Sequence, residues 1–209
     1  MERSLHLITS GRQTLAETLQ VAAAAARGGV DYLHIREKQR SARELLEWVE
    51  ALSQVFPRER ILVNDRLDVA LAASCAGVHL AYHSLPPQLA KKLLAPQYLL
   101  GQSVHSLAEA EQAERAGVSY VLYGHVYESG SKPGLAPRGT QELRQIAKRL
   151  RIPLIAIGGI KPEHVPELLA AGCAGIAVLS GIAAAADPQA AARAYRHALD
   201  SAPAAAPQE

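Results

Sequence analysis

The chain alternates between short β-rich apolar runs and longer alanine-rich segments in which apolar residues recur with a helical period. Leu15, Leu19 and Ala22 keep one face of the first such segment apolar, which predicts an amphipathic helix. Four helical segments reach a glycine just before a β-rich run begins. These glycines are Gly29, Gly77, Gly117 and Gly172. Because glycine suits the left-handed conformation that closes many helices, the repeat predicts parallel β/α units.

Capping signals mark where these helices begin. A hydroxyl residue is followed three positions later by glutamate at Thr14–Glu17, Ser41–Glu44 and Ser106–Glu109. In such a capping box the hydroxyl and the carboxylate satisfy free N–H groups of the first turn. Pro162 and Pro188 stand where a first helical turn tolerates proline, so two further helices are expected to begin there.

Eight β-rich runs follow one another at even spacing. We predict strands over residues 5–9, 31–36, 60–64, 77–81, 98–103, 119–124, 153–158 and 175–180. A doubly wound open sheet is the structural alternative, but eight evenly spaced units favour closure into a (β/α)8 TIM barrel. We expect one domain over residues 1–200 and a disordered tail over residues 201–209, which are rich in alanine and proline.

Composition narrows the class of protein. The net charge of +2 is small and the basic residues are not clustered, so no nucleic-acid partner is expected. No apolar run approaches the length of a membrane span, and the N-terminus lacks a signal-peptide core. We therefore predict a cytoplasmic protein without a membrane partner. Cys75 and Cys173 are interpreted as reduced and structural.

Polar residues collect where the predicted strands end, which is the face that carries the active site in TIM barrels. Arg36 and Lys38 follow the second strand, Asn64 ends the third, and Ser103 ends the fifth. Arg36 shares a strand face with His34, and alternation points this face into the barrel. These four polar residues are candidates for substrate binding.

Two glycine-rich ends come from consecutive units, Gly158-Gly159 after the seventh strand and Ser180-Gly181 after the eighth. Many barrels bind phosphate there, because glycine lets backbone N–H groups approach an anion and a hydroxyl adds a donor. The alternative is that these glycines only permit tight turns. The occurrence of glycine-rich segments after both the seventh and the eighth strand favours a phosphate site.

His125 follows the sixth strand, and Lys132 lies in the loop beyond it. An imidazole titrates near neutral pH and can transfer protons, so His125 is the catalytic candidate, although a lone histidine is as often structural. Lys132 is a candidate anion contact. Asp65 could give one oxygen to Mg²⁺, but that ion often has a second carboxylate, and Ser84 stands at the corresponding position after the fourth strand. No metal site is predicted.

These segments resemble the thiamine phosphate synthase superfamily over nearly the whole chain. The similar segments are HIREK (34–38), VNDR (63–66), GVHL (77–80), AIGGI (156–160) and VLSGI (178–182). Within the superfamily, residues 101–127 and 152–165 are most similar to the TenI thiazole tautomerase branch. Synthases carry an aspartate after strand 4 that helps to hold Mg²⁺, and Gly-Pro after strand 6. Here Ser84 and Gly124-His125 take those places, which favours the tautomerase, whereas Lys38 and Asn64-Asp65 keep the synthase pattern.

The resemblance implies an isomerase of thiamine biosynthesis, a thiazole tautomerase without a cofactor. It would aromatise a carboxythiazole ethylidene phosphate by a proton shift at His125. Arg36 would hold the substrate carboxylate, and Gly159, Ser180 and Gly181 would hold its phosphate. Two alternatives stay open, a Mg²⁺-dependent thiamine phosphate synthase and a non-catalytic regulatory barrel that binds a phosphorylated ligand. The resemblance also suggests a homodimer.

Overall fold

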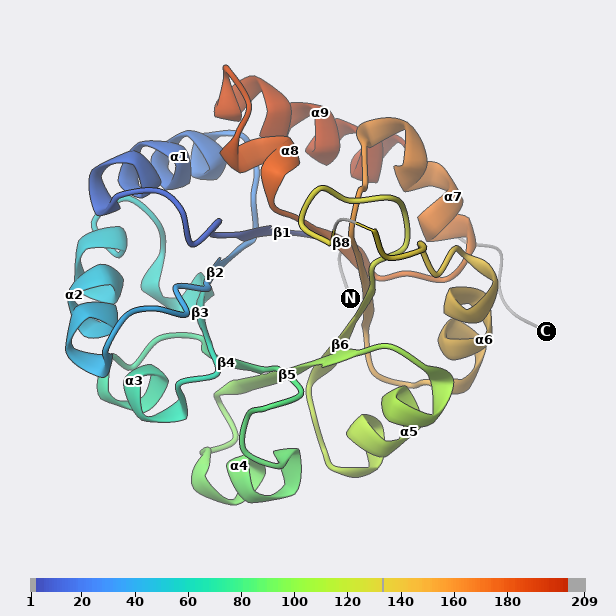
Figure 1. The fold of residues 1–209 in the computed structure, drawn as a ribbon, viewed down its shortest axis with the longest axis horizontal. Coiled ribbons are helices and arrows are strands. Elements are labelled where there is room, and N and C mark those ends of the chain that lie inside the picture. The colour runs from blue at the N-terminus through green and yellow to red at the C-terminus, as the bar shows by residue number, and fades with distance from the viewer. Residues whose placement is uncertain (1–2, 133, 203–209) are drawn as a thin grey trace.

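A computed structural model describes residues 3–132 and 134–202. Eight parallel strands form a closed barrel in chain order, and β1 pairs with β8 to complete it (Figure 1). The strands are β1 (Ser4–Ile8), β2 (Tyr32–Ile35), β3 (Ile61–Asn64), β4 (Gly77–Leu80), β5 (Leu99–Val104), β6 (Tyr120–Gly124), β7 (Leu154–Ile157) and β8 (Gly175–Val178). The predicted TIM barrel is therefore confirmed.

The helices form an outer ring around the barrel (Figure 1). They are α1 (Leu15–Arg27), α2 (Ala42–Leu52), α3 (Leu67–Ala72), α4 (Pro87–Leu93), α5 (Leu107–Arg115), α6 (Gln141–Arg149), α7 (Val165–Ala170), α8 (Ser180–Ala183) and α9 (Pro188–Ser201). Short 3₁₀ turns at Arg58–Arg60 and Pro162–His164 precede β3 and α7. The short α8 leaves β8 directly, and α9 packs beside α1 and α7.

The core has two layers. The larger apolar cluster lies between the strands and the helices, and it includes Leu33, Val63 and Ile176 of the strands and Trp48 of α2. A smaller cluster that includes Leu62, Leu122 and Ile155 fills part of the barrel interior. Buried polar side chains share that interior, and His6, His34 and His79 are nearly inaccessible. The interior is thus more polar than the branched aliphatic filling usual for this fold.

The helix starts follow the predicted capping chemistry, with one change. Thr14 and Ser41 each form a complete capping box with the glutamate three residues later. Ser106 also accepts from the backbone N–H of Glu109, but the Glu109 carboxylate accepts from the N–H of His105 instead of Ser106. Pro188 opens α9 as predicted, and the Asp187 carboxylate caps it.

The eighth strand and the chain end differ from the predicted bounds. β8 stops at Val178, because the backbone of Leu179 (φ −114°, ψ −88°) leaves the extended conformation, so Ser180 begins a helix instead of ending a strand. Ser201, assigned to the tail, ends α9. Residues 203–209 of the predicted tail lie outside the described residues.

Three further observations bear on the class of protein. Cys75 and Cys173 are buried free thiols, as expected. Burial raises the pKa of both thiols, that of Cys173 to about 12, so both are protonated at neutral pH. Among the described residues, no helix is long and apolar enough to cross a membrane.

Candidate functional site

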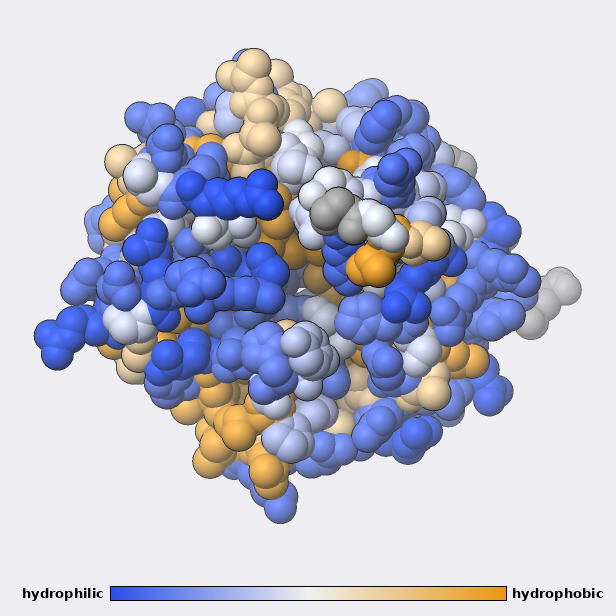
Figure 2. Space-filling view, viewed as in Figure 1, coloured by the Kyte–Doolittle hydropathy of each residue, from blue (hydrophilic) through white to orange (hydrophobic). Residues whose placement is uncertain are grey.

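A water-accessible cavity opens at the carboxyl ends of β2, β3 and β4. Its volume is about 490 Å³, large enough for a small phosphorylated molecule. It is lined by Glu37, Lys38, Arg40, Leu45, Asn64, Asp65, Arg66, Tyr82 and His83. Hydrophilic residues surround the centre of the barrel on the side of β2 and β3, whereas a hydrophobic patch lies over α4 (Figure 2). Three cationic and two acidic side chains make this cavity suited to a polyanion.

The turn after β3 presents Asp65 to the cavity. Its backbone is left-handed (φ 68°), a conformation that aspartate tolerates better than most residues. The turn is held because the Asp65 N–H donates to the His79 carbonyl at 2.8 Å. The half-exposed carboxylate then lies 3.5 Å from His83 Nε2. Asp65 therefore faces the cavity with His83 as its neighbour.

Ser84 does not offer its oxygen to the cavity in the same way. The Ser84 hydroxyl oxygen accepts from the Ala81 N–H at 2.7 Å, and the Ser84 N–H donates back to the Ala81 carbonyl at 3.1 Å. These two bonds close the turn after β4. Within residues 3–132 and 134–202, no three or more His, Cys, Asp or Glu side chains come together as a metal site.

The loop after β2 is organised by Glu37, whose carboxylate is buried. It accepts from the Gly11 N–H at 3.2 Å and lies 3.7 Å from Arg40 Nε. The guanidinium of Arg40 also stacks on Trp48, 4.2 Å from the ring centroid. These contacts orient the loop so that Lys38 faces the cavity and Arg36 stays half-buried beside it. Burial lowers the pKa of Arg36.

Residues 125–132 and 134–140 lie over the rim of the barrel beside β8 (Figure 1). His125 is 6% exposed, and its Nε2 lies 3.2 Å from the Leu135 carbonyl. Because a carbonyl only accepts, Nε2 carries the proton in this bond. Nδ1 is also buried, and it has no hydrogen-bond partner in the described part of the chain.

Arg138 fastens the far end of this loop. Its guanidinium donates to the His105 carbonyl at 2.8 Å, and its backbone N–H donates to the His125 carbonyl at 3.0 Å. Burial, and then the positive charges of Arg138 and Arg36, lower the pKa of Lys132. Burial and the nearby Lys132 likewise lower the pKa of His105. The structure thus gathers Arg36, Lys132 and Arg138 into one electropositive region.

The two glycine ends are tightly packed against their neighbours. A Cβ atom on Gly158 would lie 2.3 Å from the Cβ of His125, and one on Gly159 would lie 2.1 Å from the Glu128 carbonyl oxygen. Both glycines have positive φ, so the turn after β7 favours glycine, and the loop after β6 passes too close for a side chain at either position. Ser180 and Gly181 are exposed at the start of α8. Phosphate binding at these four residues stays a prediction.

The barrel interior contains a group of hydrogen-bonded polar side chains, of which the sequence predicted only Ser103 as a site residue. His6, His34 and His79 come from β1, β2 and β4, and Tyr120 and Ser103 join them from β6 and β5. His79 bonds both Tyr120 and Ser103, and His6 bonds His34. The inward position of His34 confirms the expected strand face. Applying the same alternation to the neighbouring strands would have found the others.

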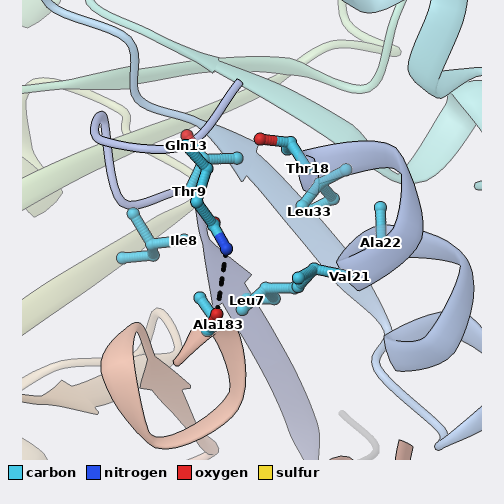
Figure 3. Close-up of a pocket in the computed structure, with 9 residues that line it drawn as sticks. All are labelled: Leu7, Ile8, Thr9, Gln13, Thr18, Val21, Ala22, Leu33 and Ala183. Atoms are coloured by element: carbon cyan, nitrogen blue, oxygen red, sulfur yellow. Dashed lines mark hydrogen bonds between the residues drawn. The ribbon is translucent and has the colours of Figure 1, made fainter. Parts of the chain in front are cut away.

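A second pocket lies between β1, α1 and α8 (Figure 3). It is lined mainly by apolar side chains, including Leu7, Val21 and Leu33, and leaves essentially no room for a water molecule. Across it, Gln13 donates to the Ala183 carbonyl at 3.0 Å, which ties α8 to the loop after β1. This pocket is packing between elements and has no room for a ligand.

The chain is similar to known proteins both in sequence and in structure. Residues 5–182 match the family model described as thiamine monophosphate synthase. A thiamine-phosphate synthase of Chlorobium phaeobacteroides is 40% identical, with 87% of this chain and 89% of the relative covered. One from Chlorobium phaeovibrioides is 44% identical, with 80% and 81% covered. The solved thiamine phosphate pyrophosphorylase of Pyrococcus furiosus superposes with a TM-score of 0.84 at 34% identity, covering 94% and 95%.

These findings confirm the superfamily and contradict the expected reaction. Relatives at this level of identity are named thiamine-phosphate synthase, so the expectation of a thiazole tautomerase, an isomerase of the TenI branch, is wrong. It depended on two positions, Ser84 and His125, whereas the similarity to synthases extends over most of the chain. The proton shift assigned to His125 was part of that expectation and is not carried further.

Proposed function

We propose, because this chain belongs to the thiamine monophosphate synthase family, that it joins a pyrimidine pyrophosphate to a thiazole phosphate. In this transfer the bond between the pyrimidine methylene carbon and the pyrophosphate oxygen breaks. The thiazole ring nitrogen forms a new bond to that carbon, and inorganic pyrophosphate leaves. The products are thiamine phosphate and pyrophosphate, with no change of oxidation state.

The cavity after β2, β3 and β4 is the observation that carries the proposal. A leaving pyrophosphate develops negative charge, and preorganised cations stabilise that charge in the transition state. Lys38, Arg40 and Arg66 line the cavity. Arg66 is held by a bidentate pair with Asp68, and Arg40 by Glu37 and Trp48, so both guanidinium groups are fixed in place. We assign this cavity to the pyrophosphate.

The residues present fit a Mg²⁺ ion that arrives with the pyrophosphate. Mg²⁺ keeps several waters and commonly binds one or two carboxylates together with substrate phosphates. Asp65 supplies one carboxylate in the cavity, 3.5 Å from His83 Nε2, and Asn64 supplies an amide beside it. Ser84 closes a turn and is not needed as a ligand in this scheme. When bound, Mg²⁺ would add positive charge against the departing pyrophosphate.

The remaining predicted residues have places in the same scheme. Arg36 and Lys132 are proposed to hold phosphate oxygens at the mouth, and Ser103 to contact a substrate from the end of β5. Gly158, Gly159, Ser180 and Gly181 are proposed to hold the thiazole phosphate through backbone N–H groups and the serine hydroxyl. His125 is proposed to hold the loop over the substrates through the Leu135 carbonyl.

Asp65 gives the sharpest test of this proposal. With both substrates and Mg²⁺ we expect thiamine phosphate to form, and chelation of the metal with EDTA to stop it. Asp65→Asn keeps the shape of the side chain but removes its charge, so kcat/KM should fall about 10²-fold. Glu47→Gln, which removes an exposed carboxylate from α2, should leave the rate unchanged. Undiminished activity in Asp65→Asn would contradict the assigned metal ligand.

A further inference from the structure

Ser103 lies at the carboxyl end of β5, with a buried hydrogen-bond chain directly behind it. Its hydroxyl oxygen is 2.9 Å from His79 Nε2, and His79 Nδ1 is 3.0 Å from the Tyr120 hydroxyl. His79 is 3% exposed and Tyr120 5%, whereas Ser103 is half-buried at the barrel mouth. A chain of three polar groups therefore leads from the interior to a residue that a ligand can reach.

The barrel has room for this hydrogen-bond chain because a glycine lies beside it. Gly101 faces the interior between His79 and Tyr120. A Cβ atom at this position would lie 2.3 Å from the Tyr120 hydroxyl oxygen and 2.6 Å from His79 Nδ1. The absence of a side chain at residue 101 is what allows the phenol and the imidazole to meet. The His79 and Tyr120 rings also stack, with centroids 5.6 Å apart and planes 29° apart.

The His79 imidazole and the Tyr120 phenol are both neutral at physiological pH. Burial lowers the pKa of His79 to about 4 and raises the pKa of Tyr120 well above its ordinary value. A neutral imidazole has one N–H donor and one acceptor nitrogen. The two bonds of His79 must therefore run in the same direction, either from Tyr120 toward Ser103 or from Ser103 toward Tyr120.

The chemistry of the phenol selects the direction. A phenolic O–H is a stronger acid than an imidazole N–H, and its oxygen is a poor acceptor because its lone pair is delocalised into the ring. Tyr120 accordingly donates to His79 Nδ1, and His79 Nε2–H donates to the Ser103 oxygen. The hydroxyl hydrogen of Ser103 is then left free to point away from His79.

We propose that Tyr120 and His79 are positioning residues that fix Ser103 as a hydrogen-bond donor to an acceptor atom of the substrate. The substrate contact rests on the proposed synthase function, but the direction of the bonds does not. If the bonds ran the other way, Ser103 would donate to His79 and could only accept from a ligand. The acceptor on the substrate would be a pyrimidine ring nitrogen or a phosphate oxygen.

Nitrogen-15 NMR of histidine-labelled protein at pH 7 tests the direction without any assay. The His79 signals can be assigned by their loss in His79→Gln. We expect the Nε2–H form in the wild type, and a mixture with Nδ1–H in Tyr120→Phe, which has lost the donor. Nδ1–H as the main form in the wild type would overturn the proposal, whatever reaction the protein catalyses.

A double-mutant cycle tests the effect on the substrate. Ser103→Ala should lower kcat/KM for thiamine phosphate formation about 3- to 10-fold, the range for loss of one neutral hydrogen bond. Tyr120→Phe should lower it several-fold in the wild type and should have no further effect in the Ser103→Ala background. An equal loss in both backgrounds would show that Tyr120 does not act through Ser103 and would overturn the proposal.

Two controls separate positioning from a general loss of structure. Tyr98→Phe removes a half-buried phenol from the segment before β5 and should change neither the His79 tautomer nor kcat/KM. His79→Gln retains an amide donor and should keep more activity than His79→Leu at equal thermal stability. If the wild type makes no thiamine phosphate, the proposed function fails, while the tautomer measurement still decides the direction of the bonds.

Discussion

The positions of Asp65, Ser84 and His125 at this site depend on backbone conformation and on hydrogen bonds to nearby carbonyl and N–H groups. Asp65 occupies a left-handed position in which its carboxylate stays available. Ser84 uses its hydroxyl oxygen to close a turn, which explains why a serine is accommodated there without serving as a ligand. His125 could be proposed as a site residue from its place after β6, and that role stays a prediction. Its bond to the Leu135 carbonyl could not be predicted, because the partner lies in an irregular loop.

Gly101→Ala should destabilise the fold. The added methyl group would overlap the Tyr120 hydroxyl and His79 Nδ1, so both rings must shift. We expect a loss of about 1–3 kcal/mol in the free energy of unfolding, measured by urea denaturation. The matched control is Gly130→Ala, because a Cβ there meets no atom within 4 Å. Equal stability of the two variants would show that the space at residue 101 is not required.

At the scale of elements, the alternation of β and α segments could be predicted because each unit carries local signals that start and end its helix. Glycines after helices and hydroxyl–glutamate caps are local signals, so every strand was located within about two residues. The largest error was in the predicted end of the eighth strand at Ser180, where the backbone turns directly from β8 into α8. The sequence between residues 125 and 140 carries no helix-start or helix-end signal that places it. Its position depends on contacts with residues distant in sequence, such as the bond from Arg138 to the His105 carbonyl.

Arg138→Gln should loosen that loop. The variant loses the charged donor to the His105 carbonyl, so Lys132 would no longer be held near Arg36. We expect KM for the phosphorylated substrates to rise about fivefold with a smaller change in kcat, together with faster amide exchange over residues 126–139. Arg144→Gln, which breaks an exposed pair with Glu167, is the control. Unchanged exchange and KM in Arg138→Gln would contradict this role.

At the scale of the molecule, the polar interior of the barrel was hidden from the sequence search. His6, His34 and His79 stand on three different strands, and only the register of the closed sheet brings the His34 ring to 5.1 Å from that of His6 and 5.3 Å from that of His79. The reaction was mispredicted for a related reason. Ser84 and His125 were interpreted as if they decided the chemistry alone, whereas the cavity is assembled from the ends of three strands and is lined by three cationic side chains.

The buried histidines should make the fold labile to acid. Burial lowers the pKa of His6 to about 3 and of His79 to about 4, and lowers that of His34 well below its ordinary value. In the unfolded chain these groups titrate near 6.5, so below that pH the unfolded state binds more protons. The free energy of unfolding should therefore fall as the pH drops from 6.5 toward 4, by roughly 1 kcal/mol or more per pH unit.

Urea denaturation at pH 7 and pH 5 measures this effect. His79→Gln should reduce the difference between the two pH values, because one of the titrating groups is gone. His83→Gln removes an exposed imidazole and should leave the difference unchanged. A wild-type protein that is equally stable at both pH values would contradict a neutral histidine cluster inside the barrel.

Phosphorus NMR of one reaction mixture tests the proposed transfer most directly. The mixture contains the protein, Mg²⁺, the pyrimidine pyrophosphate and the thiazole phosphate, and parallel samples omit one substrate. We expect free pyrophosphate and thiamine phosphate to appear in equal amounts only when both substrates are present. Absence of both products from the complete mixture, or release of pyrophosphate without the thiazole phosphate at the same rate, would contradict a synthase.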